Sequence, residues 1–271
     1  MSRRSSPVSQ FRAQAGFSMI ELSIAMLIAL FLLGGLLTLV IGTRRTTSTQ
    51  TAVSQLQDNE RIAMTLITNL VQKAGYFPDP TTQQLNATSF PAEAALAGVA
   101  LPGGQVLGGL YNAAAPGDTF LVRFIAPAND TTANPTIVNC AGQSNTSGAT
   151  GVWYTNAFKV GTVNGTSWLQ CLTRTSGAGG VLTINLIPNV TQIAVLYGVA
   201  SGAAGDDYSV VQYLNATQVT ATTNWLNVSS VKVSLTFQVP VYGTTGGQMS
   251  STLTTTFTRV IPIMSRAGVD T

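Results

Sequence analysis

Residues 16–42 read GFSMIELSIAMLIALFLLGGLLTLVIG, and this stretch decides the fold. From Leu22 to Gly42 the only polar side chains are those of Ser23 and Thr38. A helix of this length rises about 31 Å, which matches the hydrocarbon core of about 30 Å in a bilayer. The apolar region of an ordinary cleaved signal peptide is shorter, at about 7 to 15 residues. The stretch therefore predicts a membrane-spanning helix.

One residue at the head of this stretch does not suit a simple anchor. Glu21 is a carboxylate, and a charge in the bilayer core costs about 2.5 to 3.5 kcal/mol, less near the interface, so a partner is expected. Cleavage after Gly16 would create a free α-amino group on Phe17, four residues before Glu21. The two groups could pair within one helix. Pairing with the amino terminus of an adjacent subunit would instead make Glu21 a docking residue.

The formal charge of +3 comes from the leader that precedes Phe17. Three arginines (Arg3, Arg4 and Arg12) lie there, whereas every acidic residue follows it. Removing them leaves 10 basic residues against 10 acidic ones. Beyond the pair Arg44–Arg45 no basic cluster could hold a phosphate backbone, so we predict no direct nucleic-acid binding.

The residue types argue against an enzyme. The chain has no histidine, which excludes His-based triads, His metal sites and Cys-His nucleophiles. The acidic residues are mostly scattered, so a hydrolase with a carboxylate pair is disfavoured but left open. Asp206 and Asp207 fall short of the six to eight oxygen ligands that Ca²⁺ prefers, which indicates an exposed turn. We expect no cofactor and no metal site.

The two cysteines, Cys140 and Cys171, lie 31 residues apart beyond the apolar stretch. In an oxidising compartment they would form one disulfide, worth roughly 3 to 4 kcal/mol in the loop-entropy description. Two buried free thiols are the alternative.

The helix is predicted to continue past the membrane, from Phe17 to Ala74 without a break. Apolar residues recur at steps of three and four, with Glu60 filling the gap in the series. Gly75 is suited to end the helix, and Pro78 prevents its continuation. The residues of this stripe are Val53, Leu56, Ala63, Ile67, Leu70 and Ala74.

A β-rich region is predicted after Pro80. Residues 81–115 are rich in Ala, Gly and Pro without a clear period, which indicates a loop with short irregular elements. Val228–Val239 is the clearest strand, because apolar and polar residues alternate along it. Further strands are expected at Thr119–Ile125, Val152–Tyr154, Ser167–Thr173, Val181–Leu186, Gln192–Tyr197, Tyr208–Leu214 and Thr252–Ile263, with Gly-rich loops at Ser176–Gly180, Gly198–Asp207 and Gly243–Gly247.

The fold class that follows is α+β, with one long N-terminal helix packed on a mainly antiparallel β-sheet. We divide the chain into a leader (1–16), a membrane-spanning helix (17–42), an amphipathic helix (43–75) and a β-rich globular domain (76–271). The three tryptophans lie beside predicted strands, so we expect them to fill a core or an interface rather than bind ligands. They are Trp153, Trp168 and Trp225.

The run GFSMIE at residues 16–21, followed by some twenty apolar residues, resembles the N-terminal signal of type IV pilins and the related pseudopilins. The resemblance implies cleavage by a prepilin peptidase between Gly16 and Phe17, and N-methylation of Phe17. It also implies that Glu21 neutralises the amino terminus of a neighbour during assembly. A plain signal anchor or a secretory peptide is the alternative, and neither explains an acid just beyond a Gly-Phe junction.

The resemblance narrows to PilW-type minor pilins further along the chain. Residues 55–80, QLQDNERIAMTLITNLVQKAGYFPDP, are similar to the post-membrane helix of that family. The runs NVTQIAVLYGVASGAAGDDYSVVQYLNATQV, WLNVSSVKVSLTFQVP and FTRVIPIMSR are similar to its C-terminal half. The paired glycines Gly34–Gly35 and the ending SRAGVDT depart from the family pattern.

A PilW-like minor pilin would be a bacterial inner-membrane precursor with a periplasmic C-terminal domain, later assembled into a pilus on the cell surface. The resemblance implies a place at or near the tip, where the subunit primes assembly and presents a tip adhesin, hence twitching motility, attachment or DNA uptake. The implied partners are the prepilin peptidase, other minor and major pilins, the inner-membrane assembly platform, the adhesin and the membrane. The alternatives are a type II secretion pseudopilin and a membrane-anchored β-rich binding module that never polymerises.

Overall fold

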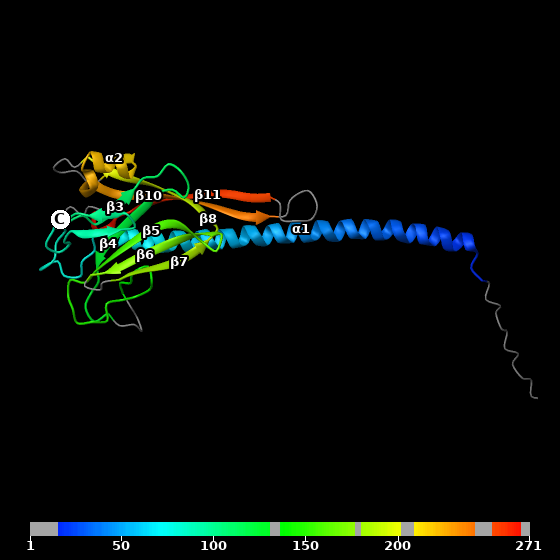
Figure 1. Ribbon diagram of the computed structural model, residues 1–271, viewed down its shortest axis with the longest axis horizontal. Helices are drawn as coiled ribbons and strands as arrows, with labels where there is room; N and C mark the ends of the chain where they lie inside the picture. Colours follow the sequence, from blue (N-terminus) through cyan, green and yellow to red (C-terminus); the bar gives the residue numbers. More distant parts are fainter. Residues whose placement is uncertain (1–15, 131–135, 177–179, 202–208, 242–250, 267–271) are drawn as a thin grey trace, which may run out of the picture. The chain divides into compact units, whose positions relative to one another are not determined.

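A computed structural model of the 271-residue chain describes residues 16–130, 136–176, 180–201, 209–241 and 251–266 (Figure 1). The chain divides into two compact units, Met1–Gln50 and Thr51–Thr271. Its elements are α1 (Met19–Gln72), β1 (Glu93–Leu96), β2 (Val99–Leu101), β3 (Leu107–Leu110), β4 (Thr119–Ile125), β5 (Trp153–Val163), β6 (Thr166–Thr175), β7 (Val181–Pro188), β8 (Val190–Ala200), β9 (Val210–Leu214), α2 (Ala216–Ala221), β10 (Val228–Val241) and β11 (Ser251–Pro262), with 3-10 helices η1 (Asn224–Asn227) and η2 (Met264–Arg266).

The long helix α1 is confirmed to within two residues at each end of the predicted range. Its first backbone hydrogen bond runs from the N–H of Leu22 to the carbonyl of Ser18, at 3.1 Å. It ends before Gly75, which has a φ of 72° and so takes the left-handed conformation that closes many helices. The N–H of Gly75 donates to the carbonyl of Arg123 at 2.9 Å, which attaches the helix end to β4.

The second half of α1 buries a wider face than the predicted stripe. Most of the stripe residues are buried, but Val53 is only half-buried. Three residues outside the stripe, Ala52, Met64 and Val71, are buried as well. The reason is that this half of the helix and residues of both large sheets form one hydrophobic core. Packing on one sheet would bury a single stripe, whereas packing in a core shared with two sheets buries a wider face.

The strands form separate antiparallel sheets rather than the single sheet that was expected. Within the described ranges, the order is β3-β4-β5-β6-β7 in a five-stranded sheet and β11-β10-β8-β9 in a four-stranded sheet, and β1 pairs with β2. An isolated parallel bridge between Gly117 and Ile193 links the two large sheets. The prediction of mainly antiparallel pairing is confirmed.

The strand predictions were accurate where the apolar pattern was strong. β4 has the predicted bounds, and the alternation in β10 is confirmed because Val231, Val233 and Leu235 are fully buried. The predicted bounds of β5 were too short, since this strand extends to Val163. Burial of residues of both faces along its first half removes the alternation that signals a strand.

Two further predictions were wrong, and one short helix was missed. Residues 81–115 contain β1, β2 and β3, and Gly198 lies inside β8, where it pairs with Tyr213 of β9. The short helix α2 was not predicted either, although Asn215 and Gln218 form a capping box at its start. Outside the described residues lie residues 177–179 of the predicted loop at 176–180, the whole predicted loop at 243–247, and the residues of the Gly198–Asp207 loop from 202 onward.

Candidate functional site

The predicted processing site precedes α1. Gly16 and Phe17 are exposed, with 85% of Phe17 accessible, and a Cβ atom placed on Gly16 would meet no atom within 4 Å. Among the described residues, no side chain covers the peptide bond between them. Of the predicted leader, residues 1–15 lie outside the described part of the chain.

Glu21 lies in the first turn of α1, one turn after Phe17. A carboxylate at this end of a helix interacts favourably with the helix dipole, typically by about 0.3 to 1 kcal/mol. Within the described part of the chain, Glu21 makes no ion pair. Its side chain is exposed, so it is available to a group from outside this chain.

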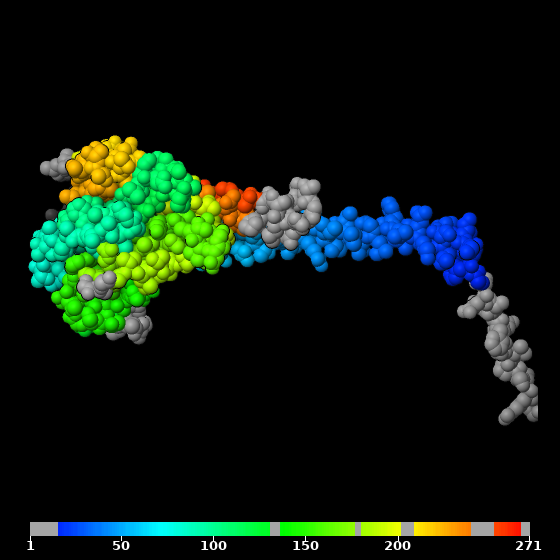
Figure 2. Space-filling model, in the orientation of Figure 1, coloured from blue at the N-terminus to red at the C-terminus, as the bar shows by residue number. Residues whose placement is uncertain are grey.

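The first half of α1 presents apolar side chains on all faces. Its large hydrophobic residues are exposed, and Figure 2 draws this half of the helix in blue. The two hydroxyl groups in the apolar run are satisfied within the helix: Ser23 Oγ donates to the carbonyl of Met19 at 3.0 Å, and Thr38 Oγ1 donates to that of Gly35 at 2.7 Å. This arrangement suits a hydrocarbon environment, where an unpaired polar group is costly. By length and composition, α1 is able to cross a membrane.

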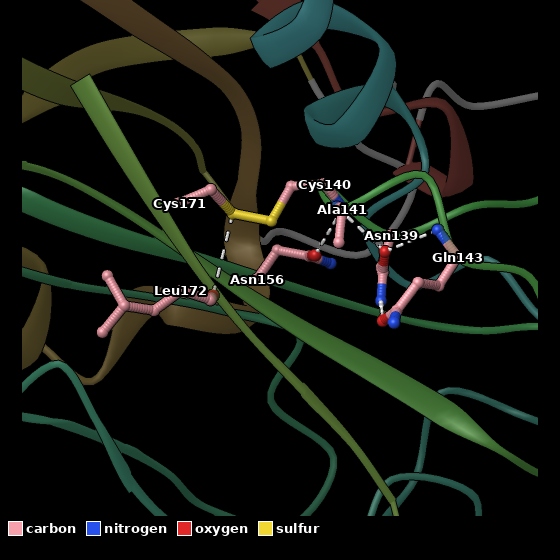
Figure 3. Close-up of a disulfide and its surroundings, with 7 residues drawn as sticks. All are labelled: Asn139, Cys140, Ala141, Gln143, Asn156, Cys171 and Leu172. Atoms are coloured by element: carbon pink, nitrogen blue, oxygen red, sulfur yellow. Dashed lines mark hydrogen bonds between the residues drawn. A yellow bond between two sulfur atoms is a disulfide. The ribbon is translucent and has the colours of Figure 1, made fainter. Parts of the chain in front are cut away.

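The predicted disulfide between Cys140 and Cys171 is present (Figure 3). The Cα atoms are 6.4 Å apart, within the usual range for a bridge. Both cysteines are buried, and the N–H of Cys140 donates to Asn156 Oδ1 of β5 at 2.9 Å. The bridge attaches the long connection between β4 and β5 (126–152) to β6.

Asp130 holds a second point of the same connection. Its carboxylate accepts hydrogen bonds from the backbone N–H groups of Ile137 and Thr136, at 3.0 and 2.9 Å. These bonds lower the pKa of Asp130 below its usual value. Lys73, at the end of α1, has its pKa lowered by burial, and the charge of Asp130 opposes that shift. The connection is thus arranged around the end of the helix.

A buried arginine positions the region of β1 to β3. Arg123 of β4 is fully buried, and its Nη1 donates to the carbonyl of Pro91 at 2.6 Å. Its Nη2 donates to the carbonyl of Gln105 at 2.5 Å. Burial lowers the pKa of Arg123 to about 10, and nearby Glu93 opposes this shift. One side chain therefore ties two distant points of the predicted loop to the five-stranded sheet.

Glu93 adds a further anchor for β1. Its carboxylate lies 3.2 Å from Nη1 of Arg174 on β6 and accepts a hydrogen bond from the hydroxyl of Thr155 on β5. Arg174 also donates to the carbonyls of Ala94 and Ala95, at 2.8 and 3.1 Å. These contacts fix the position of β1 on the five-stranded sheet. They also pair the charged side chains near Arg123 with groups of the protein itself, so no bound ligand is needed to explain why these charges lie there.

Asp118 joins the two large sheets and was not singled out from the sequence. Its Oδ1 accepts from the N–H of Asn112 at 2.8 Å, and its Oδ2 accepts from the N–H of Val195 of β8 at 2.7 Å. Burial raises the pKa of the Tyr197 phenol, and the charge of Asp118 adds to this effect. No local pattern marks such a residue, because its partners are distant in sequence.

The described residues contain no cluster of three or more His, Cys, Asp or Glu side chains that could hold a metal ion. Asp206 and Asp207 lie outside the described residues. Trp225 is buried and packs edge-on against Tyr197, with ring centroids 4.8 Å apart, as expected of a core residue. Trp153 and Trp168 are half-buried.

Comparison with known families gives two matches. Residues 157–259 match the family described as type IV pilus-assembly protein W, and residues 11–37 match the prokaryotic N-terminal methylation motif. No curated protein matches the chain. The matches support a type IV minor pilin of the PilW family, so the predicted resemblance is confirmed. They imply processing by prepilin peptidase, other pilins as partners, membrane anchoring and association with a pilus, and they point to a structural rather than an enzymatic protein.

Proposed function

We propose that this chain, a type IV minor pilin of the PilW family, is cut between Gly16 and Phe17, methylated on Phe17, and incorporated at or near the pilus tip, where it primes assembly and presents an adhesin. Residues 1–16 are the leader, 17–42 the membrane and fibre-core helix, 43–75 the amphipathic helix, and 76–271 the domain that contacts other proteins. The domain is periplasmic until the subunit leaves the membrane. Twitching motility, attachment and DNA uptake depend on the pilus that it helps to build.

One observation carries the proposal: a match to the N-terminal methylation motif lies over the start of a helix whose apolar side chains are exposed. The same exposed surface serves two environments in turn. In the membrane it faces lipid tails, and in the fibre it packs against the corresponding helices of neighbours. Because both environments are apolar, transfer between them costs little hydrophobic free energy.

Glu21 supplies the selectivity that apolar packing lacks. An ionised carboxylate in an apolar fibre core is strongly unfavourable unless it is paired. The new α-amino group of a neighbouring Phe17 would provide that pair. A neighbour in the wrong axial position would leave both charges unpaired, so the pair favours one position of the incoming subunit.

The size and composition of the domain support a minor rather than a main-shaft role. The chain has 271 residues, and charged residues make up 8% of it, against about 25% in typical domains. A large, charge-poor, β-rich surface is suited to contacts with several different partners. The tip position and the adhesin are proposed from the family resemblance.

The proposal is tested by replacing Glu21 with Ala and with Gln in a strain that lacks the native gene. We expect normal insertion into the inner membrane but loss of the subunit from sheared pili, together with reduced piliation. Glu60→Ala, which removes a carboxylate from the second half of the same helix, is the matched control and should be incorporated normally. Incorporation of both Glu21 variants at the wild-type level would contradict the proposal, and a defect in type II secretion instead of piliation would identify a pseudopilin.

A further inference from the structure

One tryptophan of the five-stranded sheet lies outside the hydrophobic core. Leu169 and Cys171 of β6 are fully buried in that core, and side chains alternate along a strand, so Trp168 points to the opposite, outer face of the sheet. Within the described residues, Trp168 belongs to neither apolar cluster, and it is only half-buried. Part of its indole ring is therefore open to solvent.

Three neighbouring strands, β5, β6 and β7, build the surface around this ring (Figure 1). Trp168 pairs with Gly161 of β5. Gln170, the next residue of β6 on the outer face, pairs with Lys159 of β5 and with Asn185 of β7. We call this surface, made of Lys159, Gly161, Trp168, Gln170 and Asn185, the Trp168 face.

The β1–β2 hairpin limits the Trp168 face on one side. Leu96 and Leu101 of the hairpin form an apolar cluster that includes Ala157 of β5, and Leu172 of β6 packs against this cluster. Leu172 follows Gln170 by two residues, on the same outer face of the sheet. The hairpin thus covers an apolar part of the outer face, and the polar part that begins at Gln170 lies beside it.

Two side-chain amides on the Trp168 face hold each other in place. Nε2 of Gln170 donates to Oδ1 of Asn185 at 2.8 Å, and Gln170 is only 9% exposed. A Cβ atom on Gly161 would collide with Oε1 of Gln170, so the Gln170 side chain lies over the Gly161 backbone and requires a glycine there. The Gln170 amide is therefore fixed in orientation by contacts on both neighbouring strands.

This amide pair keeps polar groups available to a ligand. Among the described residues, none donates a hydrogen bond to Oε1 of Gln170, and this oxygen is not buried. Asn185 is exposed, and its Nδ2 makes no hydrogen bond within the same ranges. The pair thus offers one acceptor and one donor group beside the open part of the indole ring.

The combination of a flat ring and a fixed amide pair complements a sugar. A pyranose ring has a face of C–H groups that can stack on an indole, and its hydroxyl groups both donate and accept hydrogen bonds. The indole of Trp168 supplies apolar contact at a small loss of side-chain entropy. Ligand sites typically combine such aromatic contacts with a few polar groups that fix orientation.

Other classes of ligand fit the Trp168 face less well. Its one cation is Lys159, which forms no ion pair in the described part of the chain, whereas a nucleic acid requires a cluster of cations. An added peptide strand would need a sheet edge, but Trp168 lies on β6, which has neighbours on both sides. A tryptophan that anchors a protein partner is typically desolvated in a well-packed pocket, whereas polar amides lie beside Trp168.

We infer that the Trp168 face binds a neutral glycan, with one sugar ring stacked on Trp168 and its hydroxyl groups hydrogen-bonded to Gln170 and Asn185. Lys159 donates to a further hydroxyl group. This departs from the sequence-based expectation that Trp168 fills a core or an interface. It gives the domain an attachment function of its own, in addition to the adhesin of the proposed function and independent of the position in the fibre.

The test uses the full-length protein in lauryldimethylamine oxide micelles, because this detergent has no sugar headgroup that could compete. An array of neutral oligosaccharides of glucose, galactose, mannose and N-acetylhexosamines identifies a binder, and titration calorimetry measures its affinity. Trp168→Ala should weaken binding at least about tenfold, and Trp168→Phe, which keeps a ring, should bind more tightly than Trp168→Ala. Asn185→Ala should weaken binding about three- to tenfold.

Two variants of the four-stranded sheet are matched controls. Tyr213→Ala removes an exposed aromatic ring and Gln238→Ala removes an exposed amide, and both should bind within about twofold of wild type. Because Asn185 is exposed, its variant should keep the wild-type unfolding midpoint and so remains informative even if Trp168→Ala does not fold.

Three outcomes would overturn the inference. They are the absence of any bound neutral glycan, wild-type affinity in the folded variants of the Trp168 face, and binding that disappears at about 0.5 M salt, which would indicate recognition by charge. These results are independent of the Glu21 variants, which test assembly in cells.

Discussion

The carboxylate of Asp118 accepts a hydrogen bond from the backbone N–H of Val195 at 2.7 Å, and this contact joins the five-stranded sheet to the four-stranded sheet. Asp118 is buried, and its other oxygen accepts from the N–H of Asn112. The parallel bridge between Gly117 and Ile193 lies beside it. The relative position of the two sheets therefore depends on a few polar contacts as well as on the shared apolar core.

We predict that Asp118→Ala lowers the free energy of unfolding by about 1 to 3 kcal/mol, because it leaves the buried N–H of Val195 and the partly buried N–H of Asn112 without their acceptor. Urea unfolding of the full-length protein in detergent, followed by tryptophan fluorescence, measures the change. Asp58→Ala is the control, since Asp58 forms an exposed pair with Arg61. Equal stability of the Asp118 and Asp58 variants would show that Asp118 does not hold the sheets together.

The disulfide gives a second prediction. The double variant Cys140→Ser/Cys171→Ser should be less stable than wild type by about 2 to 4 kcal/mol, and the connection 126–152 should become sensitive to protease. Reductant should destabilise the wild type but leave the double variant unchanged. Mass analysis after alkylation without reductant provides the direct check: labelling of both cysteines in the native protein would mean that the bridge is absent.

The pKa of Asp130 predicts how stability depends on pH. Because hydrogen bonds in the folded state lower this pKa from 3.8, Asp130 contributes stability above the unfolded-state value and loses it as the pH falls through the folded-state value. Stability of the wild type should therefore fall more steeply than that of Asp130→Asn as the pH is lowered from about 5 through 3.8 and below. Thermal unfolding midpoints at several pH values measure the difference. Parallel curves for the two proteins would exclude this role of Asp130.

Gly75 is predicted to be required for the turn after α1. A Cβ atom there would lie 2.9 Å from Cδ2 of Leu85 and 3.0 Å from Oγ of Ser265, and the residue has a positive φ. Gly75→Ala should lower the free energy of unfolding by at least about 1 to 2 kcal/mol. Gly180→Ala is the matched control, because a Cβ atom there meets no atom within 4 Å. A similar unfolding midpoint for both variants would contradict the prediction.

Local patterns explain which parts of the fold could be predicted. The length of α1, the end at Gly75, β4 and β10 all follow from periodicity and from residues that end a helix. The regions that were missed depend on contacts between distant residues. β1 to β3 are rich in Ala and Gly, which have weak strand preference, and they are held by Arg123 and Arg174.

The candidate functional residues also differ in whether a local sequence pattern can indicate them. Gly16, Phe17 and Glu21 are consecutive or nearly so, and a short motif is enough to propose them as a site. The contact between Asp118 and Val195 joins residues 77 positions apart, and no single segment indicates it. We expect the partner of Glu21 to be the amino terminus of another subunit, so the structure of a single chain does not contain it.

The most direct test of the central claim is mass analysis of the mature N-terminus, on protein purified from membranes and from sheared pili. We expect a chain that begins at Phe17 and carries one additional methyl group on its α-amino nitrogen. Gly16→Val should block this processing and leave the precursor in the membrane. A wild-type protein that begins at any other residue, or retains its leader in the assembled fibre, would contradict the assignment of Gly16, Phe17 and Glu21 as one processing and assembly site.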